Sequence, residues 1–268
     1  MAAAERPGAV VTGAGHGIGA AIATRLAAEG LRVVVNDIDA GAVQAVAERT
    51  GAHAVPGDAV SQHGAEELVA AARAHLGEVD VWFGNAGVDR GRGLGASDEE
   101  WAESHEVNVM AHVRAARLLV PTWAARGHGR YVVTASAAGL LTMLGSPTYS
   151  VSKHGAVAFA EWLSATYRHR GVVVQAICPQ GVRTRMLEQA DPGVRAVLTR
   201  DAALAPEDVA DAVWQALSHE RFLVLPHPEV EGYVGARAAD PDAWLAGMNR
   251  LQQRLEQAGS APAEEDGR

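Results

Sequence analysis

The sequence contains almost no lysine and almost no cysteine. Lys153 is the one lysine among 23 Lys and Arg residues, so arginine is the ordinary cation of this chain and the lysine requires a specific reason. Cys178 is the one cysteine. It cannot form an internal disulfide, which agrees with a reducing compartment.

Long apolar runs and basic clusters are also missing. No stretch approaches the roughly 18 apolar residues that span a bilayer, and Glu5 and Arg6 stand where a signal peptide would carry its apolar run. The net charge is −9, which repels nucleic-acid backbones and anionic lipid. We therefore expect a cytoplasmic protein with no nucleic-acid partner and no membrane partner.

Two further kinds of site lack their usual patterns. The 11 histidines are scattered, with no His-Glu-x-x-His motif and no grouping with cysteine, so we predict no metal site. Neither Ser97 nor Ser136 lies in a Gly-x-Ser-x-Gly elbow, which argues against a hydrolase nucleophile.

What the chain does have is a regular alternation of β-branched runs with helical stretches. Several of the runs are apolar on both faces, as strands of a parallel sheet covered by helices on each side must be. This predicts the α/β class: a single-domain Rossmann fold with a doubly wound parallel sheet of about seven strands and helices on both faces. The expected strands cover residues 9–12, 32–36, 53–56, 79–84, 130–135, 172–178 and 221–225.

We expect one domain over residues 1–258. Residues 259–268 are too polar to pack and are expected to form a disordered tail. The segment 184–204 follows the sixth expected strand, at the edge of the sheet where ligands bind, and we interpret it as a mobile substrate lid.

A glycine-rich turn joins the first strand to the first helix. It reads Thr12-Gly-Ala-Gly-His-Gly-Ile-Gly19. Glycines at such a place let the backbone approach a pyrophosphate, whose charge the helix N-terminus binds. An ordinary turn is the alternative, but the position between strand and helix favours a nucleotide site. The cofactor-binding candidates in the turn are Gly13, Gly15, His16, Gly17, Ile18 and Gly19.

Asp37 ends the second expected strand, 18 residues after Gly19. An acid at this place accepts hydrogen bonds from the adenosine ribose and repels a 2′-phosphate, so we predict NAD rather than NADP as the cofactor. Capping of the next helix is the simpler role for an acid here, and we assign it to Asp39. Asp58, followed by Ala59, is a candidate for the adenine end, with a solvated loop acid as the alternative.

Tyr149 and Lys153 are four residues apart in a stretch with helical character, which puts both side chains on one face. A phenol with a pKa of about 10 is a poor base at neutral pH. An ammonium ~5 Å away, at an effective dielectric constant of ~20, favours the phenolate by about 3 kcal/mol, or about 2 pK units. With the charge of an oxidised nicotinamide added, we expect Tyr149 to act as an acid/base at about pH 7 to 8.

Two polar residues accompany this pair. Ser136 lies 13 residues before Tyr149, at the end of the fifth expected strand, so its hydroxyl can hold a substrate carbonyl in the same cleft. Asn108 lies within a helix, where asparagine is unfavourable. It is either functional or a buried amide with satisfied hydrogen bonds.

Together these residues resemble the short-chain dehydrogenase/reductase family, in its compact single-domain branch. The resemblance spans about residues 8 to 226 and rests on Thr12-Gly-x-x-x-Gly-x-Gly19, Asn85-Ala-Gly87, Asn108, Ser136, Tyr149-x-x-x-Lys153 and Pro179 to Thr184.

The resemblance implies a catalytic tetrad. Tyr149 would be the acid/base, Lys153 would lower its pKa and bind the nicotinamide ribose, Ser136 would orient the substrate, and Asn108 would organise a proton-relay water. The resemblance also implies cofactor contacts: Asn85, Ala86 and Gly87 at the adenosine, and Tyr149, Lys153, Pro179, Val182 and Thr184 toward the nicotinamide end.

The sequence departs from the family pattern at two positions. Gly84 precedes Asn85 where a second asparagine is frequent, which removes one side chain. Gln180 stands where a glycine often follows the proline, so its amide is expected to face the pocket.

The leading hypothesis is NAD-dependent hydride transfer between a secondary alcohol and a ketone. The alternatives are a non-catalytic NAD-sensing or scaffold protein and an NADP-dependent carbonyl reductase. An NAD-dependent epimerase or dehydratase is a third alternative, but about 40 residues after the last strand, with an expected helix over 244–255, leave little room for its substrate domain.

The substrate is expected to be a small molecule and largely apolar, with Arg183 and Arg185 admitting a carboxylate as the alternative. The wide apolar faces of the expected helices over 111–125 and 155–167 predict a homodimer or homotetramer, although core packing explains part of them. The apolar substrate wall is assigned to Leu140, Leu141, Met143, Leu144 and Pro147.

Overall fold

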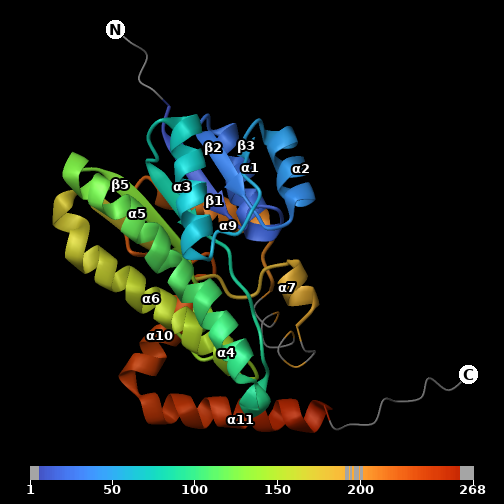
Figure 1. The fold of residues 1–268 in the computed structure, drawn as a ribbon. Coiled ribbons are helices and arrows are strands. Elements are labelled where there is room, and N and C mark those ends of the chain that lie inside the picture. Colours follow the sequence, from blue (N-terminus) through green and yellow to red (C-terminus); the bar gives the residue numbers. More distant parts are fainter. Residues whose placement is uncertain (1–5, 191–192, 194, 196–198, 200–201, 260–268) are drawn as a thin grey trace, which may run out of the picture.

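Seven parallel strands form one sheet in the order β3-β2-β1-β4-β5-β6-β7. The computed structural model describes residues 6–190, 193, 195, 199 and 202–259 (Figure 1). The predicted fold class is therefore confirmed, and each expected strand is present, most of them with shorter ends. The strands are β1 (Gly8–Thr12), β2 (Arg32–Asn36), β3 (His53–Ala54), β4 (Val81–Gly84), β5 (Gly129–Thr134), β6 (Val172–Ile177) and β7 (Leu223–Val224).

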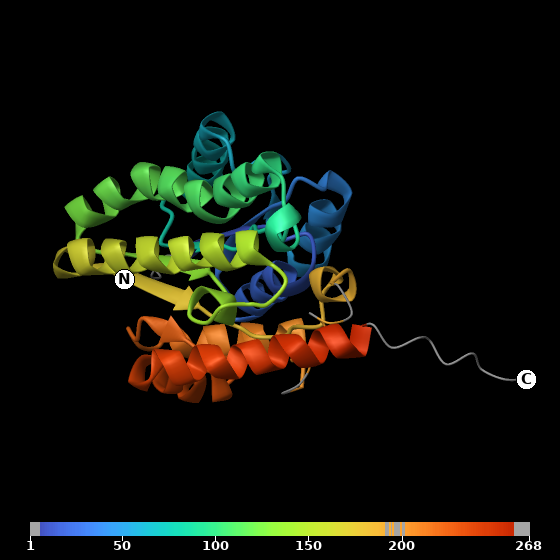
Figure 2. The same cartoon turned by 90° about the horizontal axis from the view of Figure 1, so that it is seen from below.

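Helices cover both faces of the sheet. One apolar core lies between the sheet and α3, α5 and α6, and a second lies between the sheet and α1, α2 and α9. Figure 2 shows α5 and α6 running side by side. The helices of these two layers are α1 (Gly17–Ala28), α2 (Ala40–Thr50), α3 (Gln62–Leu76), α5 (Ala111–Arg126), α6 (Pro147–Tyr167) and α9 (Pro206–Ala216).

The strands alternate between the two cores residue by residue. Val10 and Val34 face the first core, whereas Val11 and Val35 face the second. All four side chains are fully buried, as expected for parallel strands that have helices on both faces.

Local signals place the ends of individual helices. Asp39 precedes α2, and its Oδ1 accepts a hydrogen bond from the Ala42 amide at 2.9 Å, so its predicted capping role is confirmed. Ser97 and Glu100 form a reciprocal capping box at the start of α4 (Asp98–His105). After α4 the chain continues through one π-helical turn, η2 (Glu106–Met110), into α5.

The remaining elements lie at the edges of the sheet and at the end of the described chain. The short turns η1 (Gly93–Gly95), η3 (Ala137–Gly139) and α7 (Arg185–Glu188) follow strands at the carboxyl edge, and η4 (Arg168–Arg170) precedes β6 at the amino edge. Two helices, α10 (Glu229–Ala239) and α11 (Pro241–Gly259), end the described chain, and α11 crosses below α4 and α6 in Figure 1. Arg237 of α10 donates a hydrogen bond to the carbonyl of Leu140 after η3.

The expected tail over 259–268 and the expected lid over 184–204 are described only in part. Gly259 still belongs to α11, so the expected tail does not begin at this residue, and residues 260–268 lie outside the described part of the chain. The predicted lid over 184–204 is described only in part, because residues 191–192, 194, 196–198 and 200–201 lie outside. No helix within the described ranges is both long and apolar enough to cross a membrane.

Candidate active site

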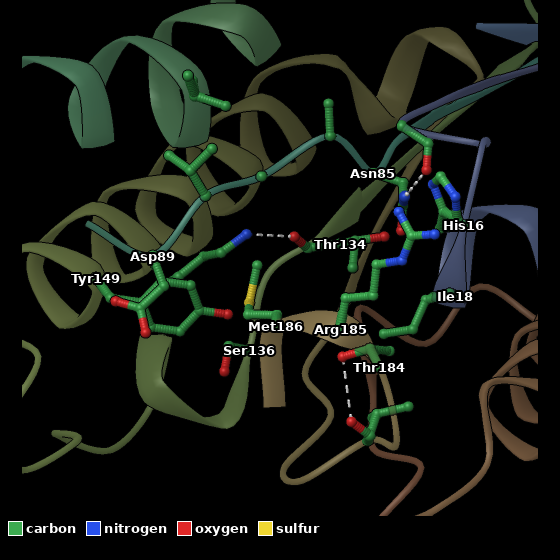
Figure 3. A pocket seen from close by; sticks show the side chains of 18 of the residues that line it. His16, Ile18, Asn85, Asp89, Thr134, Ser136, Tyr149, Thr184, Arg185 and Met186 are labelled. Atoms are coloured by element: carbon green, nitrogen blue, oxygen red, sulfur yellow. Dashed lines mark hydrogen bonds between the residues drawn. The ribbon is translucent and has the colours of Figure 1, made fainter. Parts of the chain in front are cut away.

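One cavity of about 940 Å³ lies where the loops after β1, β2, β4, β5 and β6 converge (Figure 3). Strand order reverses between β1 and β4, and such a switch point is where α/β sheets bind ligands. Most of the predicted site residues line this cavity: Gly13, His16, Gly17, Ile18, Asp37, Asp58, Ala59, Asn85, Ala86, Gly87, Ser136, Tyr149, Lys153, Pro179, Val182 and Thr184.

The glycine-rich turn forms one end of the cavity. Gly17 has a φ of +54°, and a Cβ there would lie 3.1 Å from Cγ2 of Thr184, so the segment after β6 lies directly against the turn. Gly15 and Gly19 are not among the described residues that line the cavity, and their contact with a cofactor stays a prediction. The Gly15 amide orients Asp37, and a Cβ at Gly19 would lie 2.2 Å from the Gly13 carbonyl oxygen.

Asp37 is held in place by backbone amides. Its Oδ2 accepts a hydrogen bond from Gly15 at 2.8 Å, and its Oδ1 accepts one from Asp39 at 3.0 Å. A carboxylate has about four acceptor positions, so capacity remains on the side that faces the cavity. The geometry suits a ligand that carries hydroxyl groups.

Asp58 caps its own turn and also lines the cavity. Its carboxylate accepts hydrogen bonds from the amides of Val60 at 2.7 Å and Ser61 at 3.2 Å. Burial by itself would raise the pKa of Asp58, but hydrogen bonds from Ser61 and Val60 and the charge of Arg114 lower it overall. Asp58 is therefore a fixed anion at this end of the cavity.

Asn85 ties the loop after β4 to the glycine-rich turn. Its Nδ2 donates to the carbonyls of Thr12 and Gly13, each at 3.1 Å. In return, Thr12 Oγ1 accepts hydrogen bonds from the amides of Asn85 and Ala86. These bonds hold the two central loops of the cavity in register.

Lys153 lies at the other end, fully buried, and its Nζ donates to the carbonyl of Thr134 at 2.9 Å. A Cβ on Gly87 would lie 3.2 Å from Nζ, so the glycine allows the ammonium to pass close to the loop after β4. Nζ lies 5.6 Å from the centre of the Tyr149 ring. Burial lowers the pKa of Lys153 to about 8.

Tyr149 is partly buried beside this ammonium. Burial raises the pKa of its phenol to about 12, although a hydrogen bond with the Ser136 hydroxyl acts in the opposite direction. The expectation of a pKa near neutrality did not include this cost of burial, which outweighs the effect of the neighbouring groups in the ligand-free protein.

Ser136 is fixed at the start of η3. Its Oγ accepts a hydrogen bond from the Ala138 amide at 3.1 Å and donates to the carbonyl of Pro179 at 3.5 Å. The loops after β5 and β6 are thus joined directly beside the phenol of Tyr149.

Asn108 does not line the cavity. Its Oδ1 accepts from the Val88 amide at 2.9 Å, and its Nδ2 donates to the Val88 carbonyl and to Ser152 Oγ, both at 2.9 Å. The side chain is therefore a fully satisfied buried amide, one of the two alternatives left open above. It holds the loop after β4 against α6 from within the π-helical turn, a distortion that is frequent at functional sites.

The two departures from the family pattern have structural reasons. A Cβ on Gly84 would lie 2.4 Å from Nδ1 of His112, because the buried imidazole takes the space that a side chain would occupy. Gln180 lines the cavity as predicted, and its backbone amide donates to Nδ1 of His227 at 3.1 Å.

The substrate end differs from the predicted apolar wall. Of the five residues assigned to that wall, only Met143 is among the described residues that line the cavity, and Leu140 packs against the core instead. Charged side chains that sequence reasoning missed line the cavity: Asp89, Arg90, Glu103 and Glu106. Asp89 follows Gly87 at the carboxyl end of β4, and this position was the signal that could have identified it.

The two arginines after β6 diverge. Arg183 donates to the carbonyl of Ala203 at 2.5 Å. Arg185 instead extends past Ile18 toward His16 and Asn85 (Figure 3), at the glycine-rich end of the cavity. Neither guanidinium is thus directed at the Tyr149 end, where the alternative carboxylate substrate would need one.

Comparisons with known proteins agree with this geometry. The profile of the short chain dehydrogenase family matches residues 8–194. The chain is 34% identical to 1-deoxy-11-beta-hydroxypentalenate dehydrogenase from Streptomyces avermitilis, over 87% of this chain and 88% of that protein. It is 31% identical to 3-oxoacyl-(acyl-carrier-protein) reductase from Escherichia coli, over 66% of this chain and 74% of that protein.

A solved structure extends the likeness to three dimensions. A short-chain dehydrogenase/reductase from Burkholderia phymatum, crystallised with NAD, superposes with a TM-score of 0.81 at 30% identity and covers 89% of this chain and 95% of its own. The order of the strands, the loops that meet at one cavity and these matches together show that the chain belongs to the short-chain dehydrogenase/reductase family of oxidoreductases, whose members use NAD(H) or NADP(H).

Proposed function

We propose that this chain catalyses the NAD-dependent interconversion of a secondary alcohol and a ketone. One observation carries the proposal: a single cavity has a glycine-rich turn with Asp37 at one end and Tyr149, Ser136 and Lys153 at the other. A non-catalytic NAD-sensing protein would need only the end with the glycine-rich turn and Asp37.

The residues present fit a dinucleotide. The glycine-rich turn at the N-terminus of α1 offers backbone amides and a positive helix end to a pyrophosphate, and His16 and Arg185 lie beside it. Asp37, oriented by two amides, would bind the adenosine ribose and repel a 2′-phosphate, which favours NAD. The relative crystallised with NAD supports this choice. When bound, the nicotinamide accepts or delivers the hydride.

The protein's own part is proton transfer and orientation. Ser136, held by the Ala138 amide, would turn its one hydroxyl proton from the Pro179 carbonyl to the substrate oxygen, and Tyr149 would deliver or remove the proton at that oxygen. Because burial raises the pKa of the phenol to about 12, Tyr149 would be protonated in the ligand-free protein and able to act as the acid in ketone reduction. In alcohol oxidation, the nearby ammonium of Lys153 and the positive charge of an oxidised nicotinamide favour the phenolate.

We further propose that two or four copies of the chain associate through α5 and α6. Both helices lie on one face of the sheet (Figure 2), and α6 exposes 58% of Val151 and 54% of Trp162. Two large apolar side chains on one helical stripe are typical of a surface that is covered in an assembly.

The test is a comparison of NAD⁺ and NADP⁺ over a panel of secondary alcohols, with NADH and NADPH over the matching ketones. We expect kcat/KM to be higher with NAD⁺, and Tyr149→Phe to lose at least about a hundredfold of kcat, as is usual when a positioned acid/base is removed. Tyr149→Phe should still bind NADH, measured by fluorescence titration, because it removes one hydroxyl and keeps the rest of the cavity.

Matched carboxylate variants test the choice of cofactor. Asp37→Asn should raise kcat/KM for NADP⁺ relative to NAD⁺, because it removes the charge that repels a 2′-phosphate. Asp39→Asn, which keeps a capping side chain on α2, should leave the ratio unchanged. A parent enzyme that prefers NADP⁺ would refute the role of Asp37, and binding of NADH without turnover of any alcohol or ketone would favour a sensor.

A further inference from the structure

A buried acid lies at the substrate end of the cavity. Asp89 follows the loop after β4 and lines the same cavity as Tyr149 and Ser136 (Figure 3). Its side chain is only 8% exposed. Its charge contributes to the raised pKa of Tyr149, so the carboxylate lies within electrostatic reach of the phenol.

The hydrogen bonds of Asp89 leave some of its acceptor positions unused. Arg92 donates to Oδ1 at 3.0 Å, and its own side chain is 42% exposed. Burial raises the pKa of Asp89, although the ion pair with Arg92, the nearby Ser146 hydroxyl and the charge of Arg90 all act to lower it. A carboxylate offers about four acceptor positions, so this one can still accept a hydrogen bond from a molecule in the cavity.

We propose that the Asp89 carboxylate binds a hydroxyl group on the carbon next to the reacting carbon, so that the substrates are vicinal diols and α-hydroxy ketones. This inference rests on the proposed function. Oxidation of such a diol transfers one hydride to NAD⁺ and releases one proton through Tyr149 to solvent, leaving the second hydroxyl intact. Asp89 would then be a specificity-determining residue for one end of the reaction.

The surrounding charges favour a neutral hydroxyl over the other polar groups. A substrate carboxylate would be repelled by Asp89, whereas Glu103 and Arg90 on the same wall form an ion pair and offset each other. A substrate ammonium would gain little from Asp89, because the ion pair with Arg92 already balances the charge of that carboxylate. A wholly apolar substrate would cover a buried carboxylate without providing a donor, which is unfavourable.

The experiment uses the full-length enzyme with NAD⁺ and four matched alcohols: cyclohexanol, trans-cyclohexane-1,2-diol, trans-2-aminocyclohexanol and trans-2-hydroxycyclohexanecarboxylate. We expect kcat/KM to be at least about tenfold higher for the diol than for cyclohexanol, the usual effect of one hydrogen bond to a charged group. Asp89→Leu should remove this preference by lowering kcat/KM for the diol much more than for cyclohexanol. Asp89→Asn, which retains one acceptor oxygen, should give an intermediate ratio.

A control variant, a pH profile and the rate with cyclohexanol separate substrate binding from loop structure. Glu103→Gln removes a carboxylate from the ion pair with Arg90 on the same wall and should keep the diol preference. Both Asp89 variants should move the rise of cyclohexanol oxidation with pH to lower pH, because they remove a negative charge that raises the pKa of Tyr149. Loss of loop structure would expose Tyr149 and shift the profile the same way, but it would also lower kcat/KM for cyclohexanol, which removal of one contact to the second hydroxyl should leave nearly unchanged.

The outcomes distinguish this inference from the proposed function. Turnover without a diol preference, a preference for the amine or the acid, or a diol preference that persists in Asp89→Leu would overturn the role of Asp89 and leave the alcohol dehydrogenase activity standing. No turnover of any of the four alcohols would contradict the proposed function and, with it, this inference.

Discussion

The solitary lysine shows how one residue type can be required by its surroundings. The ammonium of Lys153 reaches the Thr134 carbonyl through a passage that Gly87 leaves open. A guanidinium is larger and planar and cannot present a compact charge there. An arginine-rich chain that keeps one lysine at this place therefore points to a role that arginine cannot take.

Substitution of Lys153 should separate activity from stability. Lys153→Arg and Lys153→Met should each lose most of kcat, because neither places a compact ammonium near Tyr149. Lys153→Met should nevertheless be more stable than the parent near neutral pH, because it no longer buries a charge. The 2.5-unit difference between the ordinary pKa of 10.5 and about 8 in the fold corresponds to at most about 3 kcal/mol, reduced by the lost hydrogen bond to Thr134.

The sign of the pH dependence follows from linkage. The unfolded chain holds the lysine proton up to the ordinary pKa, whereas the folded protein releases it near pH 8. The cost of burial is thus fully present below about pH 8 and disappears as the pH rises toward about 10.5. Urea denaturation of the ligand-free proteins should therefore show the stability gap between Lys153→Met and the parent narrowing over this range. A gap that is constant with pH would contradict a buried ammonium.

At the scale of elements, β4 and α5 pack closely where Gly84 of β4 meets His112 of α5. His112 is fully buried, and burial lowers its pKa to about 3, so the ring is neutral. Its backbone carbonyl accepts a hydrogen bond from the Tyr131 hydroxyl of β5 at 3.2 Å. The imidazole thus takes the volume at the end of β4 that a larger residue at position 84 would need.

This fit predicts a strong coupling between the two positions. Gly84→Asn should destabilise the parent by about 2 kcal/mol, because its Cβ overlaps the His112 ring. In the His112→Ala background the same substitution should cost less by about 1 kcal/mol or more, since the space is then vacant. Denaturant unfolding of the four proteins in the cycle measures this coupling. Additive effects would show that the ring moves aside without cost.

At the scale of the whole molecule, the exposed stripe on α6 bears on assembly. Trp162 stacks with Phe159 and lies edge-on to Tyr167, so the exposed aromatic surface is continuous and held in place. Trp162→Glu should convert the proposed dimer or tetramer into smaller species, because it places a charge in the centre of an apolar contact. Light scattering after size exclusion gives the mass. A parent protein that is already monomeric would contradict the proposed assembly.

The expected elements were right where local patterns carry the information. Strands such as β2 and β6 are runs of valine between helical stretches. The glycine-rich turn is recognised from its composition alone. The helix expected over 244–255 is α11 (Pro241–Gly259) and is longer at both ends, because polar composition does not separate the last turn of a helix from a following segment.

The sequence by itself determined the α/β fold and brought Tyr149, Lys153, Ser136 and Asp37 to one edge of the sheet, because parallel strands with alternating helices place their carboxyl ends together. The tertiary structure alone decided what surrounds them. Burial raises the pKa of Tyr149 to about 12, and His112 fills the space beside Gly84. Charged side chains, Asp89 among them, line the cavity where an apolar wall was expected. These features depend on contacts between loops that follow different strands. Such contacts join residues far apart in the sequence, so no local sequence pattern predicts them.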